Sequence, residues 1–153
     1  MKPLLILVGL TGTGKTTTIN ALRDAGLVFT LLPNRRAVTD QQIIAHVQRI
    51  DGQPIAPVTD RTERFAYTRR YRALYAGGMA YAMEQLIMNT ELLIVNEEGF
   101  LIFDGLRGEN EVCYAAEQLP EAWFLFLDAP NFVRVQRLLK RNDAFDQVGN
   151  NGE

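Results

Sequence analysis

The stretch that decides the fold is Gly9-Leu10-Thr11-Gly12-Thr13-Gly14-Lys15-Thr16, which has the pattern G-x-x-x-x-G-K-[ST]. It follows the apolar run Leu4–Val8 and precedes a segment with helical spacing. Glycines let the backbone turn tightly with its N–H groups facing inward, and the start of a helix adds partial positive charge at the same point. The sequence therefore predicts a strand, a phosphate-binding loop and a helix in succession.

This loop predicts a site for a nucleoside triphosphate and magnesium. Lys15 is placed to reach the β- and γ-phosphates, and the Thr16 hydroxyl is placed to bind Mg²⁺. We favour ATP as the nucleotide because the guanine-specifying pattern Asn/Thr-Lys-x-Asp is absent from residues 1–153. The predicted nucleotide-binding residues are Gly9, Thr11, Gly12, Thr13, Gly14, Lys15, Thr16 and Thr17.

The composition is typical of one globular domain in 153 residues, with no internal repeat. A formal net charge of −2 argues against a surface that coats nucleic acid. The single cysteine, Cys113, cannot form an internal disulfide, so we expect a cytoplasmic protein. No apolar run reaches the length of a membrane span, so no membrane partner is expected. The oligomeric state is not predicted.

Strand and helix patterns alternate along the chain. We expect strands at 4–8, 27–32, 100–104 and 123–128, and helices at 15–25, 110–118 and 132–141. Thr39-Asp40-Gln41-Gln42 resembles a capping box that opens a further helix, and the spacing from 63 to 88 suits one or two helices with a break at Gly77-Gly78. The alternation predicts an α/β, three-layer fold: a parallel sheet of at least four strands with helices on both faces.

Four polar or glycine positions follow the predicted strands, namely Gly9, Asn34, Asp104 and Asp128. Because ligands of such sheets bind beyond the carboxyl ends of the strands, these positions are expected to meet at one edge. Asp104 has the position of an aspartate that holds Mg²⁺ through water, although an aspartate before Gly105 also suits a turn. Gly105 stands where many hydrolysing ATPases have a glutamate, which favours transfer to a bound acceptor over hydrolysis.

Two runs resemble those of a known family. Asp104-Gly105-Leu106-Arg107 resembles the Asp-Gly-x-Pro-Arg run of nucleoside monophosphate kinases, without its proline. Leu127-Asp128-Ala129-Pro130, followed by Arg137 to Arg141, resembles the passage from strand to lid helix in P-loop small-molecule kinases. The chain thus resembles the P-loop NTPase superfamily, close to nucleoside monophosphate kinases. The resemblance implies a catalytic set of Lys15, Asp104, Arg107, Arg137 and Arg141, with Thr16 and Asp104 at the metal.

A basic segment lies between the second and third predicted strands. Residues 61–72 contain five arginines and one glutamate, with aromatic side chains between them. Arginine binds phosphate through two N–H groups and stacks on rings, so this segment suits a small phosphorylated or nucleotide-like acceptor. The predicted acceptor-binding residues are Arg35, Arg36, Arg64, Arg69 and Arg70.

The resulting hypothesis is a single P-loop kinase-like domain over 1–153, with an acceptor-binding insertion at about 33–78 and a short lid at about 131–153. Its reaction would be ATP·Mg-dependent phosphoryl transfer to the anionic acceptor. Two alternatives stay open. The first is a polynucleotide kinase or other nucleic-acid-acting P-loop protein, since rings among arginines also suit single strands. The second is a nucleotide-dependent regulatory ATPase with little kinase activity.

Overall fold

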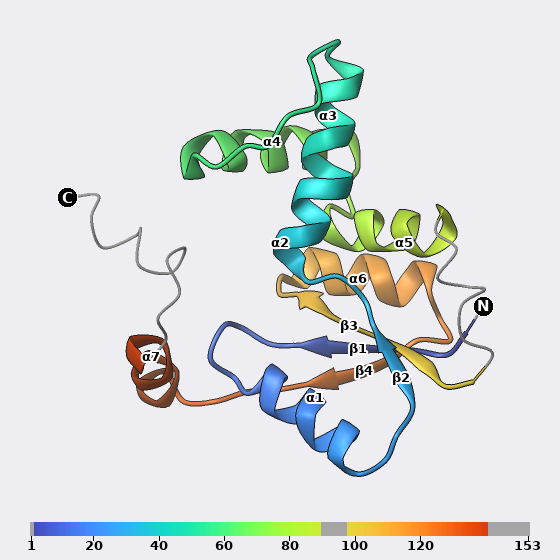
Figure 1. Ribbon diagram of the computed structural model, residues 1–153, viewed down its shortest axis with the longest axis vertical. Coiled ribbons are helices and arrows are strands. Elements are labelled where there is room, and N and C mark those ends of the chain that lie inside the picture. The colour runs from blue at the N-terminus through green and yellow to red at the C-terminus, as the bar shows by residue number, and fades with distance from the viewer. Residues whose placement is uncertain (1, 90–97, 141–153) are drawn as a thin grey trace.

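The computed structural model describes residues 2–89 and 98–140. Its centre is a four-stranded sheet in the order β2-β3-β1-β4, and every pair of neighbours is parallel (Figure 1). The strands are β1 (Leu4–Val8), β2 (Phe29–Leu31), β3 (Phe100–Leu106) and β4 (Trp123–Phe126). The predicted parallel α/β architecture is therefore confirmed.

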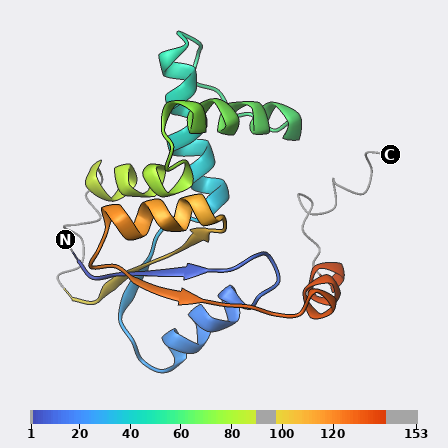
Figure 2. The ribbon, with the colours of Figure 1, turned by 180° about the vertical axis from the view of Figure 1, so that it is seen from behind.

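Helices cover both faces of the sheet because the central strands are apolar on both sides. On one face, α1 (Lys15–Asp24) packs Ile19 against Leu7 and Ile102. On the other face lie α5 (Met79–Asn89) and α6 (Glu109–Gln118), over the larger core that contains Ile6 and Phe103. Figure 2 shows the same three layers from behind.

The first helix ends in a hydrogen-bonded turn that shortens the next strand. Gly26 has a φ of 84° and its N–H donates to the Arg23 carbonyl, while the Leu27 N–H donates to the Leu22 carbonyl at 3.2 Å. These bonds cap the helix with a left-handed glycine. Residue 27 therefore belongs to the cap, and the strand expected at 27–32 covers only Phe29–Leu31.

A long helical rod follows β2. It consists of α2 (Arg35–Val38), a π-helical stretch η1 (Thr39–Ile44) and α3 (Ala45–Ile50). The expected helix start at Thr39 is wrong. Asn34 has extended backbone and its Oδ1 accepts from the Ala37 N–H at 2.9 Å, so it satisfies the helix start five residues earlier. Thr39 has helical dihedrals, and its hydroxyl donates to the Arg35 carbonyl at 2.8 Å.

The segment after the rod contains α4 (Arg61–Leu74), which is separated from α5 by a turn with Gly78 at a φ of 53°. This is the break that the sequence predicted at Gly77-Gly78. The last helix described is α7 (Asn131–Lys140). Figures 1 and 2 show α4 and α7 on the side of the molecule where the loop after β1 lies. Among the described residues, no helix is both long and apolar enough to cross a membrane.

The third strand is longer than the expected 100–104 and carries a bulge. Ile6 lies opposite Phe103 and Val8 lies opposite Leu106, so Leu7 of β1 faces both Asp104 and Gly105. A bulge inserts one extra residue and re-aims the side chains beside it. Asp104 therefore lies inside a strand, at an irregularity, rather than at the end of the strand.

Candidate active site

The phosphate loop joins β1 to α1 in a conformation that its glycines permit. Gly12 and Gly14 have φ values of 86° and 98°, a region that other residues rarely adopt, and Gly14 is the N-cap of α1. Thr13 is buried, and its hydroxyl donates to the Leu10 carbonyl at 2.8 Å. The Nζ of Lys15 donates to the Gly9 carbonyl at 2.6 Å, which holds the ammonium against the loop.

Asp104 is half-buried beside this loop. Burial raises the pKa of its carboxyl, while the positive charges of Lys15 and Arg107 oppose that rise. Asp104, Lys15 and Thr16 line the same cavity. The bulge in β3 thus brings a carboxylate to the space in front of the loop.

Oxygen donors in this space fit magnesium. Mg²⁺ takes few protein ligands, commonly one or two carboxylates together with water and substrate phosphates. Asp104 supplies a carboxylate and Thr16 a hydroxyl at one cavity, and the described residues hold no cluster of three or more His, Cys, Asp or Glu side chains. The donor set suits a metal bound jointly with a nucleotide better than a closed protein cage.

The cavity has a volume of about 520 Å³ and extends from the phosphate loop to the helical segment above the sheet. Its walls come from the loop, the rod, α4, the start of α5, the end of β3 with Arg107 after it, and the start of α6. They consist of Thr11, Gly12, Lys15, Thr16, Asn34, Arg35, Arg36, Thr39, Ile43, Arg64, Phe65, Thr68, Tyr71, Arg72, Gly78, Met79, Asp104, Arg107 and Glu111. A volume of this size accommodates small organic ligands.

The sequence matches the model of a family described as an AAA domain over residues 5–153. The chain belongs to this AAA domain family. No curated protein sequence matches it. Among solved structures, TT1252 from Thermus thermophilus is similar with a TM-score of 0.56 and 23% identity, over 92% of this chain and 73% of that one. A sugar kinase from Janibacter sp. HTCC2649 is similar with a TM-score of 0.50 and 24% identity, over 95% of this chain and 70% of that one. At these identities the likeness shows the shared fold, and this AAA domain has the fold of a P-loop kinase-like NTPase.

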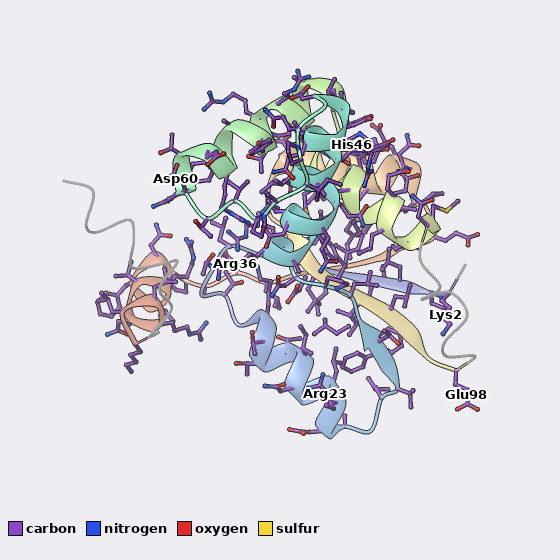
Figure 3. The ribbon with its side chains drawn as sticks, turned by 45° about the horizontal axis from the view of Figure 1, so that its top comes forward. Lys2, Arg23, Arg36, His46, Asp60 and Glu98 are labelled. Atoms are coloured by element: carbon purple, nitrogen blue, oxygen red, sulfur yellow. The ribbon has the colours of Figure 1, made fainter. Side chains whose placement is uncertain are left out.

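Three of the five predicted acceptor arginines of this AAA domain reach the cavity. Arg35, Arg36 and Arg64 line it, and Figure 3 shows Arg36 at the start of the rod, toward the phosphate loop. Arg69 and Arg70 do not line it. A helix turns by about 100° per residue, so when Thr68, Tyr71 and Arg72 face the cavity their intervening neighbours face away. Arg70 instead forms an ion pair with Asp51.

Arg35 and Arg64 of the cavity wall are bound to protein groups. Arg35 forms two parallel hydrogen bonds with Glu111 and a third with the Gly105 carbonyl. Arg64 donates to the Val58 carbonyl at 2.8 Å and pairs with Asp40.

Helix α7, which lies in the segment predicted as a lid, contacts the phosphate loop directly. Arg137 Nη1 donates to the Gly12 carbonyl at 2.8 Å, and Arg134 Nε donates to the Thr11 carbonyl at 3.1 Å. Arg134 lies one helical turn before Arg137, and its own backbone lies against Gly12, where an added Cβ would be 3.1 Å from the Arg134 carbonyl oxygen. Arg141 lies outside the described residues.

Several other predicted positions do not line the cavity, namely Gly9, Thr13 and Gly14 within the loop, Thr17, Asp128 and Arg137. Thr17 is exposed on α1 and is not part of the wall. Asp128, expected to meet the other polar residues at the sheet edge, is exposed, and its Oδ1 accepts from the Ala129 N–H at 2.9 Å. The physical reason is that β4 ends at residue 126 and is an edge strand, so the loop after it leads away toward α7.

Several wall residues were not among the predicted site residues. Helical spacing would have selected Phe65, Thr68 and Arg72 together with Arg64, because these positions share one face of α4. Glu111 carried only the weaker signal of a carboxylate four residues after Arg107. Arg134, which contacts the loop but does not line the cavity, was not predicted because the resemblance pointed to Arg137 and Arg141 on this part of the chain.

Proposed function

We propose that this protein transfers a phosphoryl group from ATP·Mg²⁺ to a small phosphorylated or nucleotide-like acceptor. The observation that carries the proposal is that the phosphate loop, Asp104 and arginines from the rod and α4 all line one shared cavity. Holding donor and acceptor in one space turns a two-molecule reaction into an effectively unimolecular one. Phosphoryl transfer asks mainly for such positioning and for stabilisation of charge.

On this proposal the loop binds the triphosphate, and Lys15 turns from the Gly9 carbonyl to the β- and γ-phosphate oxygens. Thr16 and Asp104 hold the metal, which when bound offsets the charge of the phosphate oxygens. Arg107 and Arg137 stabilise charge that spreads over the transferred group. We assign the same role to Arg141 as an expectation from its place after Arg137.

The acceptor would occupy the part of the cavity under α4. Arg36 and Arg72 would bind its anionic group, and Phe65 and Tyr71 offer rings against which a planar group can pack. We therefore propose 33–78 as the acceptor-binding insertion and 131–153 as the lid of one domain. Arg69 and Arg70 lie outside the cavity and would serve only a longer acceptor.

A second candidate, transfer to a single-stranded nucleic acid, is favoured by one feature of α4. Arg61, Phe65 and Arg72 are exposed and share one side of the helix, and the exposed Arg69 lies at the border of that side, just outside the cavity. The Arg61 guanidinium lies 5.3 Å from the centre of the Phe65 ring. Rings between cationic side chains can stack bases along a strand. The stripe continues from the cavity, which makes a polymer with its end in the cavity the alternative acceptor.

The test is turnover of Mg·ATP with and without a panel of nucleoside monophosphates, phosphorylated sugars and short oligonucleotides, followed by ADP release. Strong stimulation by a small phosphorylated compound supports the proposal. Stimulation by oligonucleotides alone, with affinity that falls steeply as salt rises, moves the assignment to the second candidate. Tight ATP binding with flat, slow turnover for every acceptor contradicts both and indicates a regulatory ATPase.

A further inference from the structure

The Arg35 guanidinium makes three hydrogen bonds to two residues of the protein, Gly105 and Glu111. Its Nη1 donates to the Gly105 carbonyl at 2.6 Å and to Glu111 Oε2 at 2.9 Å, and its Nη2 donates to Glu111 Oε1 at 2.8 Å. The Glu111 side chain is 12% exposed and the Arg35 side chain is 32% exposed. The same Glu111 Oε2 accepts from the Arg107 N–H at 3.1 Å.

These bonds connect the first turn of α2 to the segment that follows the β3 bulge. Gly105 is the neighbour of Asp104, and the backbone N–H groups of Arg107 and Gly108, which face Glu111, lie just before α6 begins. The pair thus holds the backbone on both sides of Leu106, between the proposed magnesium ligand and the proposed phosphate-binding arginine. The Phe103 ring also leaves no room for a side chain at Gly105, since an added Cβ would lie 2.5 Å from its Cζ and 3.0 Å from its Cε1.

The charge balance at Arg35 argues against a role in binding the acceptor. A bidentate carboxylate already compensates the guanidinium, so an anionic acceptor would meet a nearly neutral pair. Removing Arg35 from Glu111 would leave a buried carboxylate without its cation, which is costly. The intact ion pair is therefore lower in free energy than a state in which Arg35 or Glu111 turns to a ligand.

We propose that Arg35 and Glu111 are a positioning pair for the metal site, acting on Asp104 and Arg107 through the backbone, and that Arg35 is not an acceptor ligand. The inference rests on the proposed function, because Asp104 is taken as a magnesium ligand there. It assigns Arg35 a different role from the acceptor-binding one that the sequence predicted. It also links the acceptor segment mechanically to the residue that holds the metal.

The test is the magnesium requirement for nucleotide binding, which needs no phosphoryl transfer. A fluorescent ATP analogue is titrated at rising Mg²⁺ in the wild type, Arg35→Met, Glu111→Gln and the double variant. We expect each single variant to raise the half-saturating Mg²⁺ concentration about tenfold, as loss of a group that orients a metal ligand does. The double variant should be no worse than the singles, because either change breaks the same pair. Arg49→Met and Glu109→Gln, which alter exposed residues outside the cavity, are matched controls.

Acceptor kinetics provide the second readout. For a positioning pair, kcat falls in both single variants while the acceptor KM changes less than threefold. If Arg35→Met instead raises the acceptor KM at an unchanged magnesium requirement, and Glu111→Gln is silent, the proposal is overturned. The proposal is also overturned if the nucleotide affinity of the wild type does not change with the Mg²⁺ concentration. If the wild type binds Mg·ATP but phosphorylates nothing, the proposed function fails while the magnesium titration still decides on the pair. Glu111→Gln keeps the side-chain shape, so circular dichroism should show a folded protein even where Arg35→Met does not fold.

Discussion

Arg137 and Gly12 are 125 positions apart, yet the Arg137 Nη1 donates to the Gly12 carbonyl at 2.8 Å. This bond brings a guanidinium from α7 to the loop that is proposed to bind the triphosphate. Arg134 makes a parallel contact with Thr11. The phosphate loop is thus supported from the C-terminal side of the described chain as well as by its own strand and helix.

Arg137→Ala should reduce kcat by about 100-fold, because a cation that faces developing charge is lost. Nucleotide affinity should fall much less, since the loop N–H groups and Lys15 remain. Steady-state kinetics and nucleotide titration measure the two effects separately. Gln136→Ala, at the adjacent exposed position of α7, is the control and should behave as wild type. Equal losses in the two variants would contradict a specific role.

Lys15→Ala should lower turnover by at least about 100-fold while the protein stays folded. The ammonium is half-buried and donates to the Gly9 carbonyl within the loop, away from the apolar core of the sheet, so we expect the fold to survive its loss. ADP release measures turnover, and circular dichroism with thermal unfolding measures the fold. Near-normal turnover in the folded variant would remove the phosphate loop from the mechanism.

Asp104→Asn should stabilise the protein without metal, by about 3 °C in Tm at pH 7, while it abolishes transfer. Burial raises the pKa of this carboxyl, so the folded state holds the proton more tightly than the unfolded state. Its contribution to stability is therefore present at acid pH and is lost as the pH rises through the raised pKa. Thermal unfolding in EDTA from pH 4 to pH 7 checks this. If the variant is stabilised equally at every pH, the cause is not the burial of the ionised Asp104 carboxylate.

Glu111→Gln should destabilise the protein by about 2 kcal/mol at pH 7, because charged hydrogen bonds to Arg35 are weakened. Desolvation would raise the pKa of Glu111, but the hydrogen bonds and charge of Arg35, with the Arg107 and Gly108 N–H groups, lower it overall. A lowered pKa gives stability that is present above the ordinary glutamate pKa, about 4, and is lost as the pH falls through the lowered value. Urea unfolding should show the variant and wild type converge as the pH falls through the lowered pKa. Glu109→Gln should cost under about 0.5 kcal/mol throughout.

Arg72→Met should raise the KM for a small acceptor about tenfold, whereas Arg70→Met should leave it within twofold. Arg72 lines the cavity, and Arg70 is paired with Asp51 on another side of the same helix. A charge-assisted bond to an anion is worth roughly 1.5–3 kcal/mol, enough for this change. Equal effects of the two variants would contradict a specific role of Arg72 and indicate an acceptor that extends beyond the cavity to Arg70.

Local patterns in the sequence were enough to predict the parallel sheet and the phosphate loop. The apolar run Leu4–Val8 and the glycines at 12 and 14 impose their structure on their own neighbourhood, through burial on both faces and through backbone angles that other residues avoid. The start of the rod was predicted wrongly, because two segments could cap a helix and only the observed dihedrals show that Asn34 does so.

Which side chains share the cavity was decided by the tertiary structure. The residue types and their order along the chain already indicated a nucleotide site, an aspartate and a basic acceptor segment. Whether Arg35 faces a ligand or Glu111, and whether α7 reaches Gly12, depends on contacts between residues 76 and 125 positions apart. Local periodicity does not predict contacts between residues so far apart in the sequence. A buried charge needs an oppositely charged or hydrogen-bonding partner, and the fold decides which distant residue supplies it. The sequence thus indicated the kind of site, and packing determined which residues line the cavity and which contact one another around it.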